Sequence, residues 1–303
     1  MIKNHDTLTA NQEIFMSRAV YKLSSIARPL DTSYRSNVAV LIIMFCVALL
    51  IGGLDLGFRE ASFTASINSG ITAAIVAFLT WALGREIDPD HNETAFIALA
   101  LSVVAMALGW MPAVWTLALA LMANRLISRT VGLPARMTDM ALVIGLAAMS
   151  VFKDGYWAMG AVAGLAMAYD LYFDRKRTLN LVFATLATGL SAFAVVQNEG
   201  DWSTLIIQPL ASLDPLWSIA LLLTGSISVA MALTMPLVTS LGDATGKPLS
   251  TKRVRGGLLI TLLLGFSFLL SGQEGFMASL PVWAGFIGLI LVRLLPKPVS
   301  KNA

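Results

Sequence analysis

Long uncharged stretches of apolar residues decide what this chain can fold into. The longest covers residues 94–124, where 31 consecutive residues carry no charge. A bilayer core requires about 20 apolar residues per helical span, since hydrocarbon offers no partner to open backbone groups. The chain is 57% hydrophobic and only 13% charged, far below the roughly 25% charged residues of soluble domains. The sequence therefore predicts an all-α, polytopic membrane helical bundle.

The stretch 94–124 is too long for one upright span, because a single helix of that length would measure about 46 Å. Gly109 to Pro112 supplies a turn, with proline where a new helix can start. We therefore expect two spans within this stretch and ten in all. The others cover residues 38–54, 67–84, 138–152, 156–173, 179–196, 216–239, 256–271 and 276–292.

The basic residues indicate how these spans are oriented. With the N-terminus inside, all 21 lysines and arginines except Arg59 and Lys153 fall in predicted cytoplasmic segments, as the positive-inside rule requires. A single span over residues 94–124 would move most later basic residues outside. We therefore predict a multi-pass protein of the cytoplasmic (inner) membrane with both termini cytoplasmic. The predicted regions are an N-terminal segment (1–36), the transmembrane bundle (37–295) and a tail (296–303).

Residues 11–27 carry the pattern of a basic amphipathic helix. Phe15, Leu23 and Ile26 follow helical spacing, whereas Arg18 and Lys22 occupy other faces. Such a helix either lies on the cytoplasmic leaflet or packs against the bundle.

Two helix starts have local signals. Asp214 followed by Pro215 predicts an N-cap with proline at the first helical position. Asp90 and Glu93 have the spacing of a capping box at the start of the third span.

Two cytoplasmic clusters of carboxylates are the candidates for chemistry. Residues 85–93 hold Asp88 and Asp90 among dense oxygen ligands of the kind that Mg²⁺ prefers. Asp170 and Asp174 are four residues apart near a helix C-terminus, so they repel each other and the helix dipole. A metal ion, or an arginine from another loop, would offset that repulsion. The candidate metal ligands are therefore Asp88, Asp90, Asp170 and Asp174, and the candidate arginines, which are also candidate phosphate contacts, are Arg125 and Arg129.

An acidic loop after the second span and Asp-x-x-x-Asp after the sixth resemble the layout of the UbiA-type membrane prenyltransferases. The resemblance implies Mg²⁺ and an isoprenyl diphosphate held between the two acidic motifs. The first motif of that family begins Asn-Asp-x-x-Asp, whereas this chain has Glu86-x-Asp88-x-Asp90.

Three classes of function remain open. The first is a membrane protein that binds a lipid, an anionic ligand or a partner at its cytoplasmic face. The second is a Mg²⁺-dependent transferase acting on a prenyl or lipid phosphate, and the third is a transporter or flippase. A lone Cys46 and two histidines argue against a disulfide within the chain and against a zinc site, and no nucleic-acid partner is predicted. The candidate anion contacts of the first class are Arg125, Arg129, Arg136, Lys252, Arg253 and Arg255.

Overall fold

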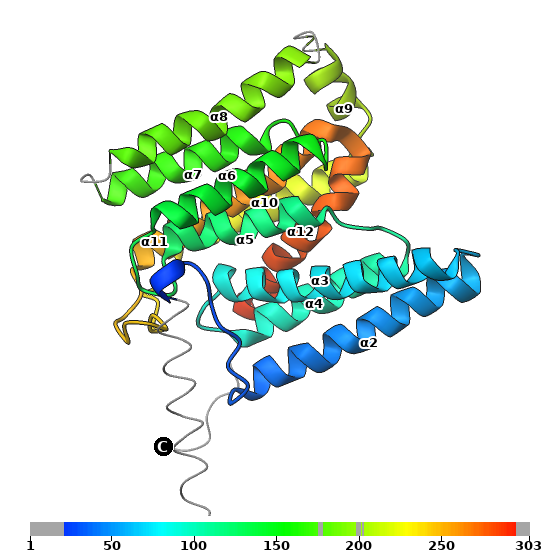
Figure 1. Cartoon of the computed structure of the whole chain (residues 1–303), viewed down its shortest axis with the longest axis horizontal. Helices are drawn as coiled ribbons and strands as arrows, with labels where there is room; N and C mark the ends of the chain where they lie inside the picture. Colours follow the sequence, from blue (N-terminus) through cyan, green and yellow to red (C-terminus); the bar gives the residue numbers. More distant parts are fainter. Residues whose placement is uncertain (1–20, 175–177, 198–200, 202, 295–303) are drawn as a thin grey trace, which may run out of the picture.

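The computed structural model of the chain describes residues 21–174, 178–197, 201 and 203–294, and these residues form helices and no strand (Figure 1). The long helices are α2 (Arg35–Phe58), α3 (Phe63–Ile87), α4 (Asn92–Ala107), α5 (Val114–Ser128), α6 (Met137–Phe152), α7 (Met159–Phe173), α8 (Leu179–Gln197), α10 (Pro215–Thr234), α11 (Thr251–Ser267) and α12 (Gly272–Leu294). Shorter elements are a π-helical turn η1 (Ser203–Ile207), α9 (Gln208–Ala211) and a 3-10 turn η2 (Phe268–Ser271).

Each of the ten predicted stretches overlaps one long helix, although the bounds differ by several residues at some ends. The stretch 94–124 is divided as predicted, because α4 ends at Ala107 and α5 begins at Val114, with Gly109 between them at φ +94°. Glycine adopts this left-handed conformation without a steric penalty. Asp214 caps α10, accepting hydrogen bonds from the N–H groups of Leu216 and Trp217. That N-cap prediction is confirmed.

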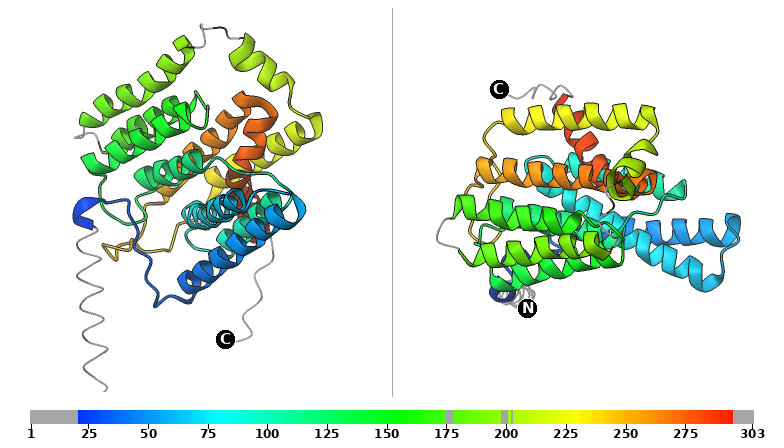
Figure 2. Two further views of the ribbon diagram at one scale, coloured as in Figure 1. Left: turned by 45° about the vertical axis from the view of Figure 1, so that its right-hand side comes forward. Right: turned by 90° about the horizontal axis from the view of Figure 1, so that it is seen from above.

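Several helices are compatible with a membrane. Five helical segments are long and apolar enough to cross a bilayer by length and composition, namely α2, α3, α8, α10 and the continuous segment Thr251–Leu294. The surface of α2 agrees, since Ile42, Phe45 and Leu49 are each about 60% exposed. Contiguous exposed apolar surface of this extent is typical of contact with lipid. Figure 2 shows the hairpin of α2 and α3 extending past the other helices at one end.

The helix α12 joins two groups of helices. It packs against α3 and α4 on one side and against α10 and α11 on the other, and α5 contacts α3, α6, α7 and α11. The centre holds large, fully buried side chains, among them Trp283, Phe286 and Phe268. Close approach depends on small residues, as is usual where helices pack in lipid. A Cβ on Gly84 would lie 2.6 Å from the backbone of Ala95, so α3 and α4 touch there almost backbone to backbone.

The contact of α7 with α8 gives a stability prediction. A Cβ on Gly160 would lie 2.5 Å from the carbonyl oxygen of Ala187, so Gly160→Ala is expected to force the helices apart and cost about 1–3 kcal/mol. A Cβ on Gly189, on α8, would meet no other atom within 4 Å, and Gly189→Ala is the matched control. Unfolding in detergent, followed by circular dichroism, measures both variants. Equal midpoints for the two would contradict this packing.

At the end opposite the main charge clusters, the loops predicted to lie outside meet one another. Arg59 donates to the carbonyl of Ala107 at 2.6 Å, joining the α2–α3 loop to the end of α4. Asp154 accepts from the backbone N–H of Thr116, which joins the α6–α7 loop to the start of α5. Trp217 packs against both Trp110 and Phe276. We call this the far end.

Some predicted features lie outside the described residues. These are most of the basic helix over residues 11–27, of which only residues 21–23 are described as helical, and the tail 296–303. The basic residues 175–177 between α7 and α8 also fall there.

Candidate anion-binding end

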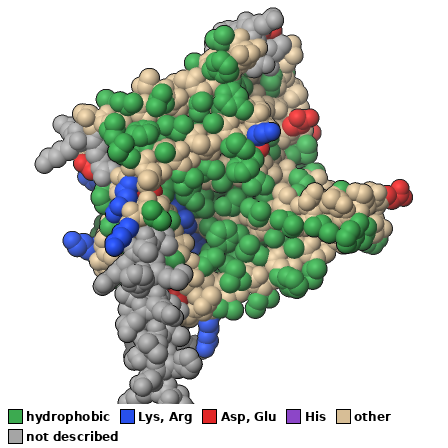
Figure 3. All heavy atoms as spheres, in the orientation of Figure 1, with side chains coloured by type: hydrophobic (Ala, Val, Ile, Leu, Met, Phe, Trp, Pro, Cys, Tyr) green, Lys and Arg blue, Asp and Glu red, His purple; other side chains and the backbone are tan. Residues whose placement is uncertain are grey.

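The carboxylates and arginines gather where α3, α5, α7 and α12 end and where α4, α6, α8 and α11 begin, which we call the charged end. Figure 3 shows Lys and Arg side chains concentrated there, beside the loop leading to α11, whereas most of the remaining face is hydrophobic. Four carboxylate residues at this end are almost completely inaccessible to solvent. They are Glu86, Asp88, Asp139 and Asp170. Buried carboxylates need charged or hydrogen-bonding partners, so their partners define the site.

Glu86, in the last turn of α3, is the centre of the first cluster. Its carboxylate accepts from Arg125 Nε at 2.8 Å and from Arg28 Nη1 at 3.2 Å. The Thr130 hydroxyl donates a third bond at 2.5 Å. Arg28 also pairs with Asp243 in the α10–α11 loop. Although burial disfavours its charge, Glu86 and Asp243 raise the pKa of Arg28, so the guanidinium stays charged.

Asp170, near the end of α7, has the arginine partner that the sequence requires. Arg129 Nη2 lies 2.9 Å from its carboxylate and Arg253 Nη1 lies 2.8 Å away. The amide of Asn180 adds a bond at 3.1 Å. Of the two arginines proposed as partners, Arg129 is therefore the one that pairs with Asp170. Arg129 also lies 3.7 Å from Asp174, which is more exposed.

Asp88, just after α3, forms a third cluster. Arg293, from the last turn of α12, donates to it at 2.8 Å, and the Thr94 hydroxyl donates at 3.2 Å. His91 Nδ1 lies 3.1 Å from the same carboxylate. This cluster joins the end of the last helix to the α3–α4 loop.

Asp90 does not form the predicted capping box, and that prediction is wrong. The helix α4 begins at Asn92, and its N-cap residue His91 makes no side-chain capping bond. Asp90 instead accepts from the backbone N–H groups of Thr239 at 3.1 Å and Ser240 at 2.8 Å. Burial raises the pKa of Asp90, but the Ser240 hydroxyl and these backbone donors outweigh it and hold the pKa below its usual value.

Three of the four predicted metal ligands, Asp88, Asp90 and Asp170, have separate sets of partners. In the part of the chain that the structure describes, no group of three or more His, Cys, Asp or Glu side chains is placed to hold a metal ion. Asp88, Asp90 and Asp170 each contact different donors, and Asp174 shares Arg129 with Asp170. Magnesium binding by these carboxylates stays a prediction. Phosphate binding by Arg125 and Arg129 also stays a prediction. In this structure Arg125 pairs with the buried carboxylate of Glu86, and Arg129 pairs with that of Asp170.

A further carboxylate, Asp139, was not predicted as a site residue. It lies in the first turn of α6 and accepts from the hydroxyls of Ser24 and Ser25 and from the backbone N–H of Ser25. It also accepts from the backbone N–H of Arg136 at 2.7 Å. The segment of residues 21–28 is thereby fixed across the charged end, from α6 to Glu86. Asp139 lies at the start of the predicted span 138–152, but no feature of the neighbouring sequence indicated Ser24 and Ser25 as its hydrogen-bond donors.

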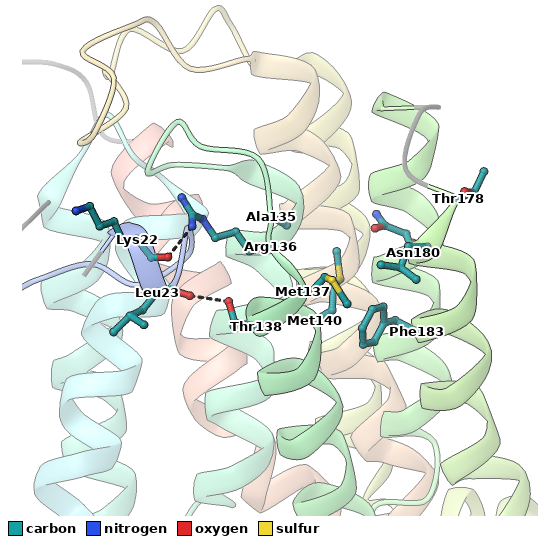
Figure 4. Close-up of a pocket in the computed structure, with 11 residues that line it drawn as sticks. Lys22, Leu23, Ala135, Arg136, Met137, Thr138, Met140, Thr178, Asn180 and Phe183 are labelled. Carbon is teal, nitrogen blue, oxygen red and sulfur yellow. Dashed lines mark hydrogen bonds between the residues drawn. The ribbon is translucent and has the colours of Figure 1, made fainter. Parts of the chain in front are cut away.

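The segment 21–28 forms one wall of a pocket of about 610 Å³ at the charged end (Figure 4). The other walls come from the starts of α6 and α8. Lys22 and Arg136 lie nearer the loops, whereas Met137, Met140 and Phe183 lie further along the helices. Arg136 donates to the backbone carbonyl of Lys22, and Thr138 donates to that of Leu23 at 2.6 Å. The pocket is thus basic toward the loops and apolar along the helices.

These observations define a class, an all-helical protein with several helices compatible with membrane insertion and a charged end built from buried ion pairs. The sequence matches no protein-family model, and comparison of the chain with curated proteins and with solved structures gave no match.

Proposed function

We propose that the chain is a multi-pass protein of the cytoplasmic (inner) membrane with ten spans and both termini cytoplasmic. The support is the way in which loops far apart in sequence meet. Every loop predicted to be cytoplasmic has described residues in contact with another such loop, as in the Arg28–Glu86 and Arg293–Asp88 pairs. The far end unites loops predicted to be outside, as in the contact of Arg59 with Ala107. Alternation of this kind is what ten antiparallel spans produce.

Labelling of single cysteines tests this topology. In a Cys46→Ala background, Lys153→Cys is expected to react with a membrane-impermeant maleimide in intact cells, because residue 153 lies in the α6–α7 loop at the far end. Lys247→Cys, in the α10–α11 loop, is expected to react only after permeabilisation. Labelling of both positions from the same side would contradict the ten-span arrangement.

We propose further that the protein binds an anionic ligand at the charged end. The observation that carries this proposal is the pocket of about 610 Å³, because both Lys22 and Arg136 are among the residues that line it. The buried arginines of this end are already paired with Glu86, Asp88 and Asp170. Lys22 is exposed, and in the described part of the chain the Arg136 guanidinium donates to a neutral backbone carbonyl, that of Lys22. Basic side chains at the edge of a membrane bundle attract anionic headgroups, each by about 1 kcal/mol.

Binding of an anion is tested by its effect on stability. Purified protein in a neutral detergent is expected to unfold at a higher temperature when an anionic phospholipid or a soluble phosphate ester is added, since a ligand that binds only the folded state stabilises it. The effect is expected to weaken as salt is raised. A panel comprising phosphatidylglycerol, glycerol phosphate and inorganic phosphate covers both lipid and soluble forms. If no member raised the unfolding temperature above that found with phosphatidylcholine, the proposal would be wrong.

A further inference from the structure

We infer that the pocket between α6, α8 and the segment 21–28 holds one phospholipid of the surrounding bilayer, with its anionic phosphate at Lys22 and Arg136 and an acyl chain between α6 and α8. This inference rests on the proposed function and names its ligand. The inference commits to a lipid of the bilayer as the ligand. A free phosphate would use the same basic residues, and the experiment below distinguishes the two.

The two halves of the pocket match the two halves of a phospholipid. Arg136 supplies positive charge at the level of the loops, where headgroups lie. Lys22 lies at the same level; its side chain points away from Arg136 in Figure 4, but it is exposed and free to turn toward a headgroup. The first residues of α8 also face the pocket, and a helix N-terminus favours a phosphate. Met137, Met140 and Phe183 continue the lining along the helices. A free phosphate would use only the first half and would leave this apolar lining in contact with water.

The pocket also adjoins surface that suits the hydrocarbon of the bilayer. On α8, Leu179 lines the pocket and is 43% exposed, and Val182 and Leu186 beyond it are more than half exposed. On α6, Met137 lines the pocket and is 62% exposed. Apolar side chains at these levels of exposure are stable in contact with lipid tails. A lipid therefore reaches the pocket sideways from the bilayer, without its chains crossing water.

Lys22 is the better residue for testing the headgroup. Arg136 donates to the carbonyl of Lys22, so its loss would also loosen the segment 21–28. The contact of Lys22 with Arg136 is made through its backbone, which Lys22→Gln retains. We expect Lys22→Gln to weaken binding of phosphatidylglycerol about tenfold, because it removes a charge-assisted contact with the phosphate. Lys247→Gln removes an exposed charge from the same end, outside the pocket, and is expected to leave binding unchanged.

Leu179→Trp tests the acyl-chain half. The larger side chain occupies the pocket mouth, and the exposure of Leu179 allows the substitution without disturbing the core. We expect this variant to lose at least tenfold in affinity for phosphatidylglycerol. Leu186→Trp, two turns further along α8 and outside the pocket, is the matched control and is expected to bind as the wild type does.

The experiment measures retention of phosphatidylglycerol, phosphatidylcholine and glycerol phosphate by the full chain, using native mass spectrometry and thermal unfolding. We expect tight retention of phosphatidylglycerol alone, reduced by both pocket variants and by neither control. If pocket and control variants retained it equally, the lipid would bind elsewhere on the charged end. If glycerol phosphate stabilised the protein as much as the lipid, the ligand would be a free anion. Either result overturns this inference and leaves the proposed function standing, whereas failure of every anionic probe overturns both.

Discussion

Replacing Glu86 by glutamine is expected to lower the free energy of unfolding by roughly 3–5 kcal/mol, the range found when one partner of a buried ion pair is removed. The carboxylate is fully buried and pairs with both Arg125 and Arg28, whose side chains are themselves mostly buried. Glutamine retains the capacity to accept a bond from Thr130 but supplies no charge. Two guanidinium groups would then remain near one another without this counterion. Unfolding by SDS, monitored by circular dichroism, measures the loss.

The matched control is Glu93→Gln, because Glu93 is an exposed acidic residue in the first turn of α4. Its loss is expected to cost less than about 0.5 kcal/mol. Combining Glu86→Gln with Arg125→Met tests the pairing directly, since removal of both charges should restore part of the stability lost in the single variant. Strictly additive losses in the double variant would show that Glu86 and Arg125 do not interact.

Asp170→Asn is expected to destabilise the protein by roughly 3 kcal/mol or more, because it removes the common partner of two largely buried arginines. The Asp170 carboxylate also stabilises the backbone conformation of Arg129. Arg129 ends α5 with φ +50°, a left-handed conformation that costs a non-glycine residue about 1–2 kcal/mol. The bonds to Asp170 help to hold it there. The expected readout is a lower unfolding midpoint together with faster exchange of amide hydrogens in the turn between α5 and α6.

Asp174→Asn distinguishes a specific effect of Asp170 from a general loss of negative charge on α7. Asp174 is partly exposed and lies 3.7 Å from Arg129, so its replacement is expected to cost about 0–1 kcal/mol, as for exposed ion pairs. Similar losses in the two variants would contradict the separate importance of Asp170.

The helices of this fold are largely predictable from sequence because each is a local pattern. The division of residues 94–124 followed from helix length and from the turn at Gly109 to Pro112. The cap at Asp214 followed from its neighbour Pro215. The end of α10 was not predicted correctly, because the predicted stretch continued to residue 239 whereas the helix ends at Thr234. Pro236 follows that end, and proline cannot donate the backbone bond that a continuing helix requires.

The site was predictable only where the sequence left a charge without a local partner. Asp170 was such a residue, and the expectation of an arginine from another loop led to Arg129. The capping box predicted at Asp90 was wrong. The spacing between Asp90 and Glu93 fits a capping box, but the groups that donate to Asp90 lie about 150 residues later in the chain. The bonds from Ser24 and Ser25 to Asp139 join residues more than 110 positions apart, and no single-sequence pattern specifies contacts at that range.

The segment 21–28 has a consequence for synthesis of the protein. Its anchors are Glu86, Asp139 and Asp243. Asp243 is 215 residues later in the chain than Arg28, so the ribosome must add all of those residues before the last anchor exists. The segment 21–28 must therefore wait for the helices that follow it in the chain. This wall of the pocket is therefore fixed only after α3, α6 and α10 have been synthesised.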